Sequence, residues 1–162
     1  MVTNLISNKY TNPPFNQDCI KDRCDQRCRL KDIHPQQYLI LDGDEIEKCN
    51  CNSSHQADQS CDCIILKDPF HNKVLLVELR SGHKPTSITE AKNKFLTSAN
   101  EIINTIEEFG ESIQSLSFLL LGKVEMSGKK SKKREFYING RYCFIDISPC
   151  GTSIEYMNKF TD

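Results

Sequence analysis

Two nearly continuous apolar runs near the middle of the chain, residues 61–66 and 74–79, constrain the fold more than any other feature. Each run is interrupted by one carboxylate, Asp62 in the first and Glu78 in the second. Strands with so little alternation are buried on both faces of a sheet. The segment between them, residues 67–72, contains Asp, Pro and Asn, which favour turns. The sequence therefore predicts a hairpin of two buried strands.

A long helix is predicted after this hairpin. Ser87 and Glu90 form a capping box, with a serine at the cap and a glutamate three residues later. Apolar residues then recur at helical spacing as far as Phe109, where Gly110 provides a natural stop. The apolar positions are Ala91, Phe95, Ala99, Ile102, Ile103 and Ile106.

Further strands are predicted at residues 38–41 and 116–121, from their short apolar runs. Residues 135–138 and 141–147 flank an Asn-Gly pair, which is a strong hairpin signal. Strands and a helix in this order predict an α/β fold with a mixed β-sheet flanked by helices.

The length of 162 residues, with 38% hydrophobic and 27% charged residues, indicates one globular domain. We expect a polar arm at residues 1–16, a cysteine-containing helical and loop region at 17–60, and the core at 61–147. A charged helix is predicted at residues 16–32. The apolar runs are far shorter than the roughly 20 residues of a membrane span, so no membrane association is expected.

Asp62 and Glu78 need a reason to lie in apolar strands, because a buried carboxylate is usually paired or bound to a metal. If the two strands are neighbours, Asp62 lies beside Glu78 at one end of the sheet. Arg80 follows Glu78 by two residues and so projects to the same face. Two carboxylates with waters suit a hard divalent cation. The alternative is that Glu78 pairs with Arg80 and Asp62 caps a turn.

This arrangement, Asp62 followed by Glu78-x-Arg80 on a hairpin before a long helix, resembles the PD-(D/E)xK nuclease superfamily. That group includes restriction endonucleases and archaeal Holliday-junction resolvases, and the resemblance covers about residues 60–122. It implies a restriction-endonuclease-like core and Mg²⁺ or Mn²⁺ held by Asp62 and Glu78. It also implies hydrolysis of DNA or RNA phosphodiester bonds, a catalytic role for position 80, and a homodimer as in many relatives.

The chain departs from that motif at Arg80, where the family has lysine. Arginine holds phosphate through two bonds, but it does not release a proton near neutral pH. Lys84, Lys92 and Lys94 are candidates to replace the lysine. An additional upstream acid is expected at Glu45 or Glu47. The alternative function is a catalytically inactive nuclease-fold module that binds nucleic acid or protein.

The nine cysteines suggest a second metal site. Two pairs lie close in sequence, and four thiolates would close a Zn²⁺ site, with an iron–sulfur cluster as the alternative. A zinc-stabilised interaction protein is therefore a third interpretation, and plain burial of the thiols is the other. The four candidate ligands are Cys24, Cys28, Cys49 and Cys51, and Cys19 or His55 would replace one of them.

The N-terminal segment lacks the basic and apolar parts of a signal peptide, so a cytoplasmic location is expected. Thiols stay reduced in that compartment, so we expect no disulfide framework. Cys61 and Cys63 flank Asp62 and should point away from it into the core. Cys143 is also expected in the core.

The net charge of −1 excludes a chain that coats nucleic acid as a polycation. Residues 123–134 are nevertheless strongly basic, which favours contacts with phosphates, although an exposed lysine-rich loop is the alternative. The predicted nucleic-acid-binding residues are Lys84, Lys129, Lys130, Lys132, Lys133 and Arg134. Phe136, Tyr137 and Tyr142 follow in the next hairpin, where some would stack on bases and some would enter the core.

Overall fold

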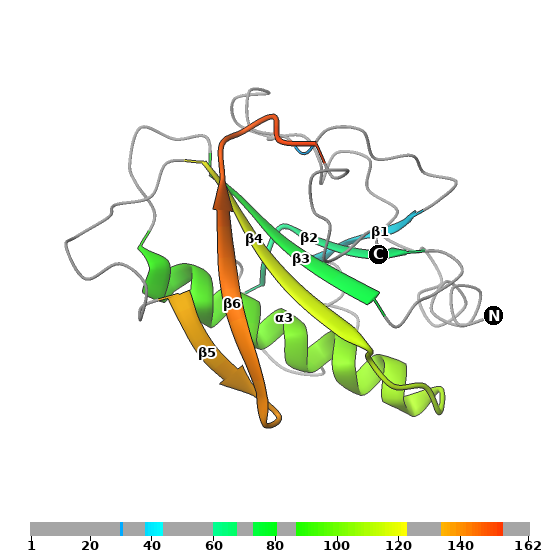
Figure 1. Ribbon diagram of the computed structural model, residues 1–162. Helices are drawn as coiled ribbons and strands as arrows, with labels where there is room; N and C mark the ends of the chain where they lie inside the picture. Colours follow the sequence, from blue (N-terminus) through cyan, green and yellow to red (C-terminus); the bar gives the residue numbers. More distant parts are fainter. Residues whose placement is uncertain are drawn as a thin grey trace, which may run out of the picture.

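A mixed six-stranded sheet and one long helix make up the described part of the chain (Figure 1). The computed structural model describes residues 30, 38–43, 60–67, 73–80, 87–122 and 134–153, without the side chains of Asp42 and Arg80. The α/β class is confirmed, with a single helix among these residues. The elements are β1 (Tyr38–Asp42), β2 (Cys63–Lys67), β3 (Lys73–Arg80), α3 (Ile88–Glu108), β4 (Ser115–Gly122), β5 (Glu135–Ile138) and β6 (Arg141–Ser148).

The strands lie in the order β1-β2-β3-β4-β6-β5. The central strands β3, β4 and β6 are parallel, while β1, β2 and β5 pair antiparallel with their neighbours. The predicted hairpin is confirmed, because β2 pairs antiparallel with β3. Its first strand was predicted to begin at Cys61 and begins at Cys63 instead. Asp62 therefore lies one residue before the strand, and the prediction that it lies within the strand is wrong.

The helix α3 has the limits that its sequence predicts. The backbone N–H of Glu90 donates to Oγ of Ser87 at 3.4 Å, so the serine caps the first turn. The helix ends at Glu108, and Gly110 adopts a φ of 75°, which a residue with a side chain disfavours. The apolar face of α3, built on Phe95, Ala99 and Ile102, is fully buried against the sheet.

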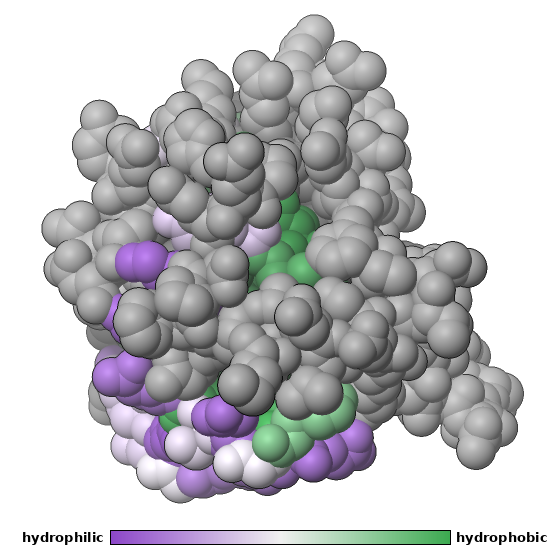
Figure 2. All heavy atoms as spheres, turned by 90° about the vertical axis from the view of Figure 1, so that its right-hand side faces the viewer, coloured by the Kyte–Doolittle hydropathy of each residue, from purple (hydrophilic) through white to green (hydrophobic). Residues whose placement is uncertain are grey.

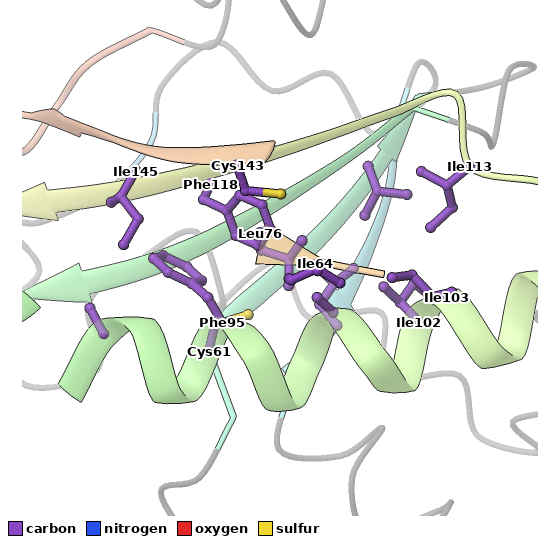
Figure 3. Packing of buried hydrophobic residues seen from close by; sticks show 14 of the residues in the cluster. Cys61, Ile64, Leu76, Phe95, Ile102, Ile103, Ile113, Phe118, Cys143 and Ile145 are labelled. Atoms are coloured by element: carbon purple, nitrogen blue, oxygen red, sulfur yellow. The ribbon is translucent and has the colours of Figure 1, made fainter. Parts of the chain in front are cut away.

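The core fills both faces of the sheet, as the continuous apolar strands predict. On the α3 face, the core cluster takes side chains from every strand, and Figure 3 shows those of Ile64, Leu76 and Phe118 between the sheet and the helix. Phe118 of β4 lies at its centre, with ring centroids 5.4 Å from Phe95 and 4.8 Å from Phe136. Figure 2 views the molecule from the side where α3 ends. Hydrophilic residues gather there on the surface at the level of the helix.

A second apolar cluster covers the opposite face of the central strands. It contains Ile65, Val77 and Leu119 with their neighbours, and Leu30 packs onto it with only 2% of its surface exposed. Leu30 is the one described residue of the helix predicted at residues 16–32, which otherwise lies outside the described residues, as does the predicted arm.

The β5–β6 hairpin turns at Asn139 and Gly140, as predicted. Both residues have positive φ, 48° and 75°, which matches a type I′ turn. None of the helices in the described ranges is long and apolar enough to cross a membrane.

Candidate active site at the carboxyl edge of the sheet

Asp62 and Glu78 lie next to each other where β2 begins and β3 ends. Cys63 pairs with Val77, so the next positions along this antiparallel ladder are Asp62 and Glu78. The backbone N–H of Leu79 donates to Oδ2 of Asp62 at 2.6 Å, which ties the two strand ends together. Glu78 meets Lys94 of α3, and Asp62 lies across from it at the start of β2, with its carboxylate on the backbone of β3.

This end of the sheet is where the parallel strands terminate. Glu78 is in register with Leu120 of β4, and Leu120 with Ile147 of β6. Open α/β sheets commonly bind their ligands at the carboxyl ends of their strands. The carboxylate pair therefore lies at the edge where a ligand site is expected.

Glu78 is almost fully buried, with 1% of its side chain exposed, and it is paired with a lysine of α3. Nζ of Lys94 lies 2.9 Å from Oε1 of Glu78. Lys94 is itself only 12% exposed, so this ion pair is largely removed from water. Of the candidate lysines, Lys94 reaches the site, whereas Lys92 donates to the backbone carbonyl of Glu135 at 2.7 Å. Lys84 and the side chain of Arg80 lie outside the described residues.

The backbone that carries Asp62 is held from two further directions. The amide of Cys61 donates to Oγ of Ser98 at 2.8 Å, one helical turn after Lys94. The amide of Gly43 donates to the carbonyl oxygen of Asp62 at 3.2 Å. A Cβ at Gly43 would overlap the Cys61 carbonyl, so this close approach requires glycine.

Ser98 and Gly43 were not predicted to serve the site. Ser98 gave a signal, because it is a polar residue on the apolar face of a predicted helix, between Phe95 and Ile102. Gly43 gave none beyond its turn composition, because its close contact involves a segment almost twenty residues away in sequence.

Like Cys63, Cys61 is buried in the core, as predicted. The chain bends before β2, so the alternation expected of a strand does not extend back to this residue. Its side chain packs in the α3-side cluster near Phe95 (Figure 3). Burial, followed by the charges of Glu78 and Asp62, raises the pKa of the Cys61 thiol far above its usual range, although a hydrogen bond with Ser98 acts in the opposite direction. The thiol is therefore protonated at neutral pH.

The raised pKa of Cys61 predicts a loss of stability in alkali. Thiols of the unfolded chain ionise near pH 8.5, whereas folded Cys61 keeps its proton. Because the folded state then binds more protons, the free energy of unfolding should fall above that pH by up to about 1.4 kcal/mol per pH unit. Urea denaturation between pH 7 and pH 10 measures this slope. In Cys61→Ala the slope should be shallower, and equal slopes for both proteins would contradict the prediction.

Two cysteines correct the expectation of reduced thiols. Cys63 and Cys150 are each disulfide-bonded, and both belong to the cluster on the face opposite α3. Cys61 and Cys143 are free and buried. The predicted zinc or iron–sulfur ligands Cys24, Cys28, Cys49 and Cys51 lie outside the described residues.

Most of the predicted nucleic-acid-binding residues also lie outside the described ranges, namely Lys129, Lys130, Lys132 and Lys133. Arg134 is described and lies immediately before β5, with Cζ 6.0 Å from the centroid of the Phe144 ring. The expected upstream acids Glu45 and Glu47 are not among the described residues. Within the ranges that the structure does describe, no three His, Cys, Asp or Glu side chains gather to hold a metal ion. The described acidic site is thus a pair of carboxylates.

No known protein resembles this chain closely enough to assign its function. A scan of protein-family models gives no match, and searches of curated proteins and of solved structures give none either.

Proposed function

We propose that the chain is a metal-dependent nuclease of the restriction-endonuclease-like type, which hydrolyses phosphodiester bonds of DNA or RNA. The carrying observation is the Asp62–Glu78 pair at the carboxyl edge of the sheet, in which Asp62 is half-buried and Glu78 is buried and contacted by a lysine of the following helix. The order of elements β2-β3-α3-β4 around the pair agrees with the core that the resemblance implies.

The carboxylate pair fits Mg²⁺ or Mn²⁺, because both cations prefer oxygen ligands and retain several waters. Asp62 and Glu78 would hold the cation. When bound, it would supply an activated water and neutralise charge on the phosphate. Asp62 is oriented for this role by the Leu79 amide, and Glu78 by Lys94.

In this proposal Lys94 takes the part that the superfamily assigns to the lysine two residues after the glutamate. Its ammonium lies against the Glu78 carboxylate, so a positive charge is present at the site whatever the position of Arg80. A lysine ammonium is also able to give up a proton, which a guanidinium does not do in proteins. Arg80 would then bind a substrate phosphate.

Cleavage of labelled single-stranded and duplex DNA and RNA, with Mn²⁺ or with a chelator, tests the proposal. Asp62→Ala and Glu78→Gln should each slow metal-dependent cleavage by roughly 100-fold or more, because a catalytic metal stabilises the transition state by several kcal/mol. The amide in Glu78→Gln keeps the shape of the buried side chain. Glu107→Ala, which removes an exposed carboxylate of α3, is the matched control and should cleave normally.

A second function is favoured by the Glu78–Lys94 ion pair, which neutralises the glutamate without a metal. In that case the chain is an inactive nuclease-fold module that binds nucleic acid or protein. A thermal shift on adding Mn²⁺ separates the two, because a ligand that binds only the folded state must stabilise it. The nuclease should show a shift that Asp62→Ala abolishes. The absence of both cleavage and shift would favour the binding module.

A further inference from the structure

The outer face of the β5–β6 hairpin presents an exposed pair of tyrosines. Tyr137 and Tyr142 are directly opposed in the ladder, with 69% and 57% of their surfaces exposed. Their ring centroids are 5.6 Å apart and the rings are inclined by 70°. They are the exposed large hydrophobic side chains of the described residues. The alternate positions, Phe136 and Cys143, enter the core, so the hairpin cannot turn its tyrosines inward without exposing them.

Next to the tyrosines the same face carries an arginine. Phe144 is two residues from Tyr142 on β6 and so shares its face, and it pairs with the first residue of β5. The guanidinium of Arg134 lies over the Phe144 ring at 6.0 Å from its centroid. Residues 123–134, which lead into the hairpin, contain six Lys or Arg and one Glu. The face therefore combines aromatic rings with the charge of Arg134, and the segment that precedes it in sequence adds basic residues that suit a polyanion.

Glu135 also affects the charge of this face. Desolvation, followed by the neighbouring Glu135, raises the pKa of Tyr142. Glu135 is opposite Phe144, the ring that Arg134 covers, so its carboxylate offsets the Arg134 charge there. The exposed tyrosine rings are the part of this face that suits uncharged bases.

We propose that this hairpin face is a stacking surface for unpaired bases, so that the substrate class is single-stranded nucleic acid. This inference rests on the proposed function and names its substrate. Every base has an aromatic face that stacks on tyrosine, whereas a duplex hides those faces between neighbouring base pairs. Exposed rings with adjacent positive charge thus select for unpaired strands without reading sequence.

The hairpin and the carboxylates are linked through the start of α3. Lys92 donates to the carbonyl of Glu135 at the beginning of β5, and two residues later Lys94 contacts Glu78. The Arg134 end of the hairpin therefore lies at the same end of α3 as the candidate active site.

Binding measured without metal tests this inference separately from cleavage. Fluorescence anisotropy of labelled 15-nucleotide oligo(dT) and oligo(U), and of a duplex of equal length, is recorded in a chelator. We expect the single strands to bind more tightly than the duplex. Tyr137→Ala and Tyr142→Ala should each weaken single-strand binding roughly tenfold, since stacking contributes this order of affinity per base. Tyr137→Phe and Tyr142→Phe keep the ring and should bind as the unaltered protein does.

Tyrosine emission gives a second measurement, because the chain contains no Trp and five Tyr. Single strands should quench the emission, and less so in either alanine variant. Wild-type affinity in both alanine variants, equal affinity for the duplex, or no binding of any probe would each overturn the stacking surface. Metal-dependent cleavage that is lost in Asp62→Ala, together with any of these results, would leave the proposed nuclease function standing. Single-strand binding that depends on the tyrosines, without any cleavage, would support the stacking surface and contradict the nuclease function.

Discussion

Lys94→Met is expected to destabilise the protein and, under the proposed nuclease function, to abolish metal-dependent cleavage. The substitution leaves Glu78, with 1% of its side chain exposed, as a buried carboxylate that has lost its partner on α3. Breaking a buried ion pair on one side costs roughly 3–5 kcal/mol. Thermal denaturation of Lys94→Met, beside the double variant Glu78→Gln/Lys94→Met, measures this effect. The double variant removes both charges and should recover most of the lost stability.

Lys94→Arg separates a structural role from a role in the reaction. Arginine keeps the positive charge at Glu78 but does not release a proton near neutral pH. We therefore expect a normally folded protein whose cleavage is slower by roughly 100-fold, the lower range for loss of a positioned proton-transfer group. Lys92→Arg, on the same helix and bonded to a backbone carbonyl instead, is the matched control and should cleave normally. Cleavage by Lys94→Arg at the unaltered rate would show that the lysine only supports Glu78.

Phe118→Ala is expected to have the largest effect on stability outside the carboxylate site. Phe118 is fully buried and stacks edge-to-face on Phe95 of α3 and Phe136 of β5. Truncating a buried phenylalanine costs roughly 3–5 kcal/mol through lost burial and the cavity that remains. Because this ring joins three elements, we expect the β5–β6 hairpin to lose protection from hydrogen exchange as well.

Urea denaturation and native-state hydrogen exchange measure the two effects of Phe118→Ala. Phe118→Leu fills most of the space and should cost distinctly less. Asn104→Ala, at an exposed position of α3, should stay within about 0.5 kcal/mol of the original protein and serves as the control. A loss below about 1 kcal/mol in Phe118→Ala would mean that the core collapses around the vacated space, contrary to the interlocked packing.

The strands and the helix could be read from the sequence, because local signals specify them. Apolar runs place β3 and β4, the capping serine places the start of α3, and the Asn-Gly pair places the β5–β6 turn. The sequence predicts the start of β2 two residues too early, because apolar composition continues through Cys61, where the chain bends. The neighbourhood of Asp62 and Glu78 followed from the hairpin, in which pairing along the ladder brings them together.

Other features of the site depend on how distant segments pack. Sequence spacing left Lys84, Lys92 and Lys94 equally eligible, and only the packing of α3 on the sheet directs Lys94 to Glu78 and Lys92 to β5. The supports from Ser98 and Gly43 are likewise contacts between segments far apart in the chain.

By itself, the sequence determined the elements of this protein and the pair of carboxylates at the end of its central hairpin, because periodicity, capping and turn chemistry are local. Tertiary structure decided the strand order, the lysine that joins the pair, and the exposure of Tyr137 and Tyr142 while Phe136 is buried. Those outcomes depend on the contacts that form when the helix packs on one face of the sheet, and no short stretch of residues specifies those contacts.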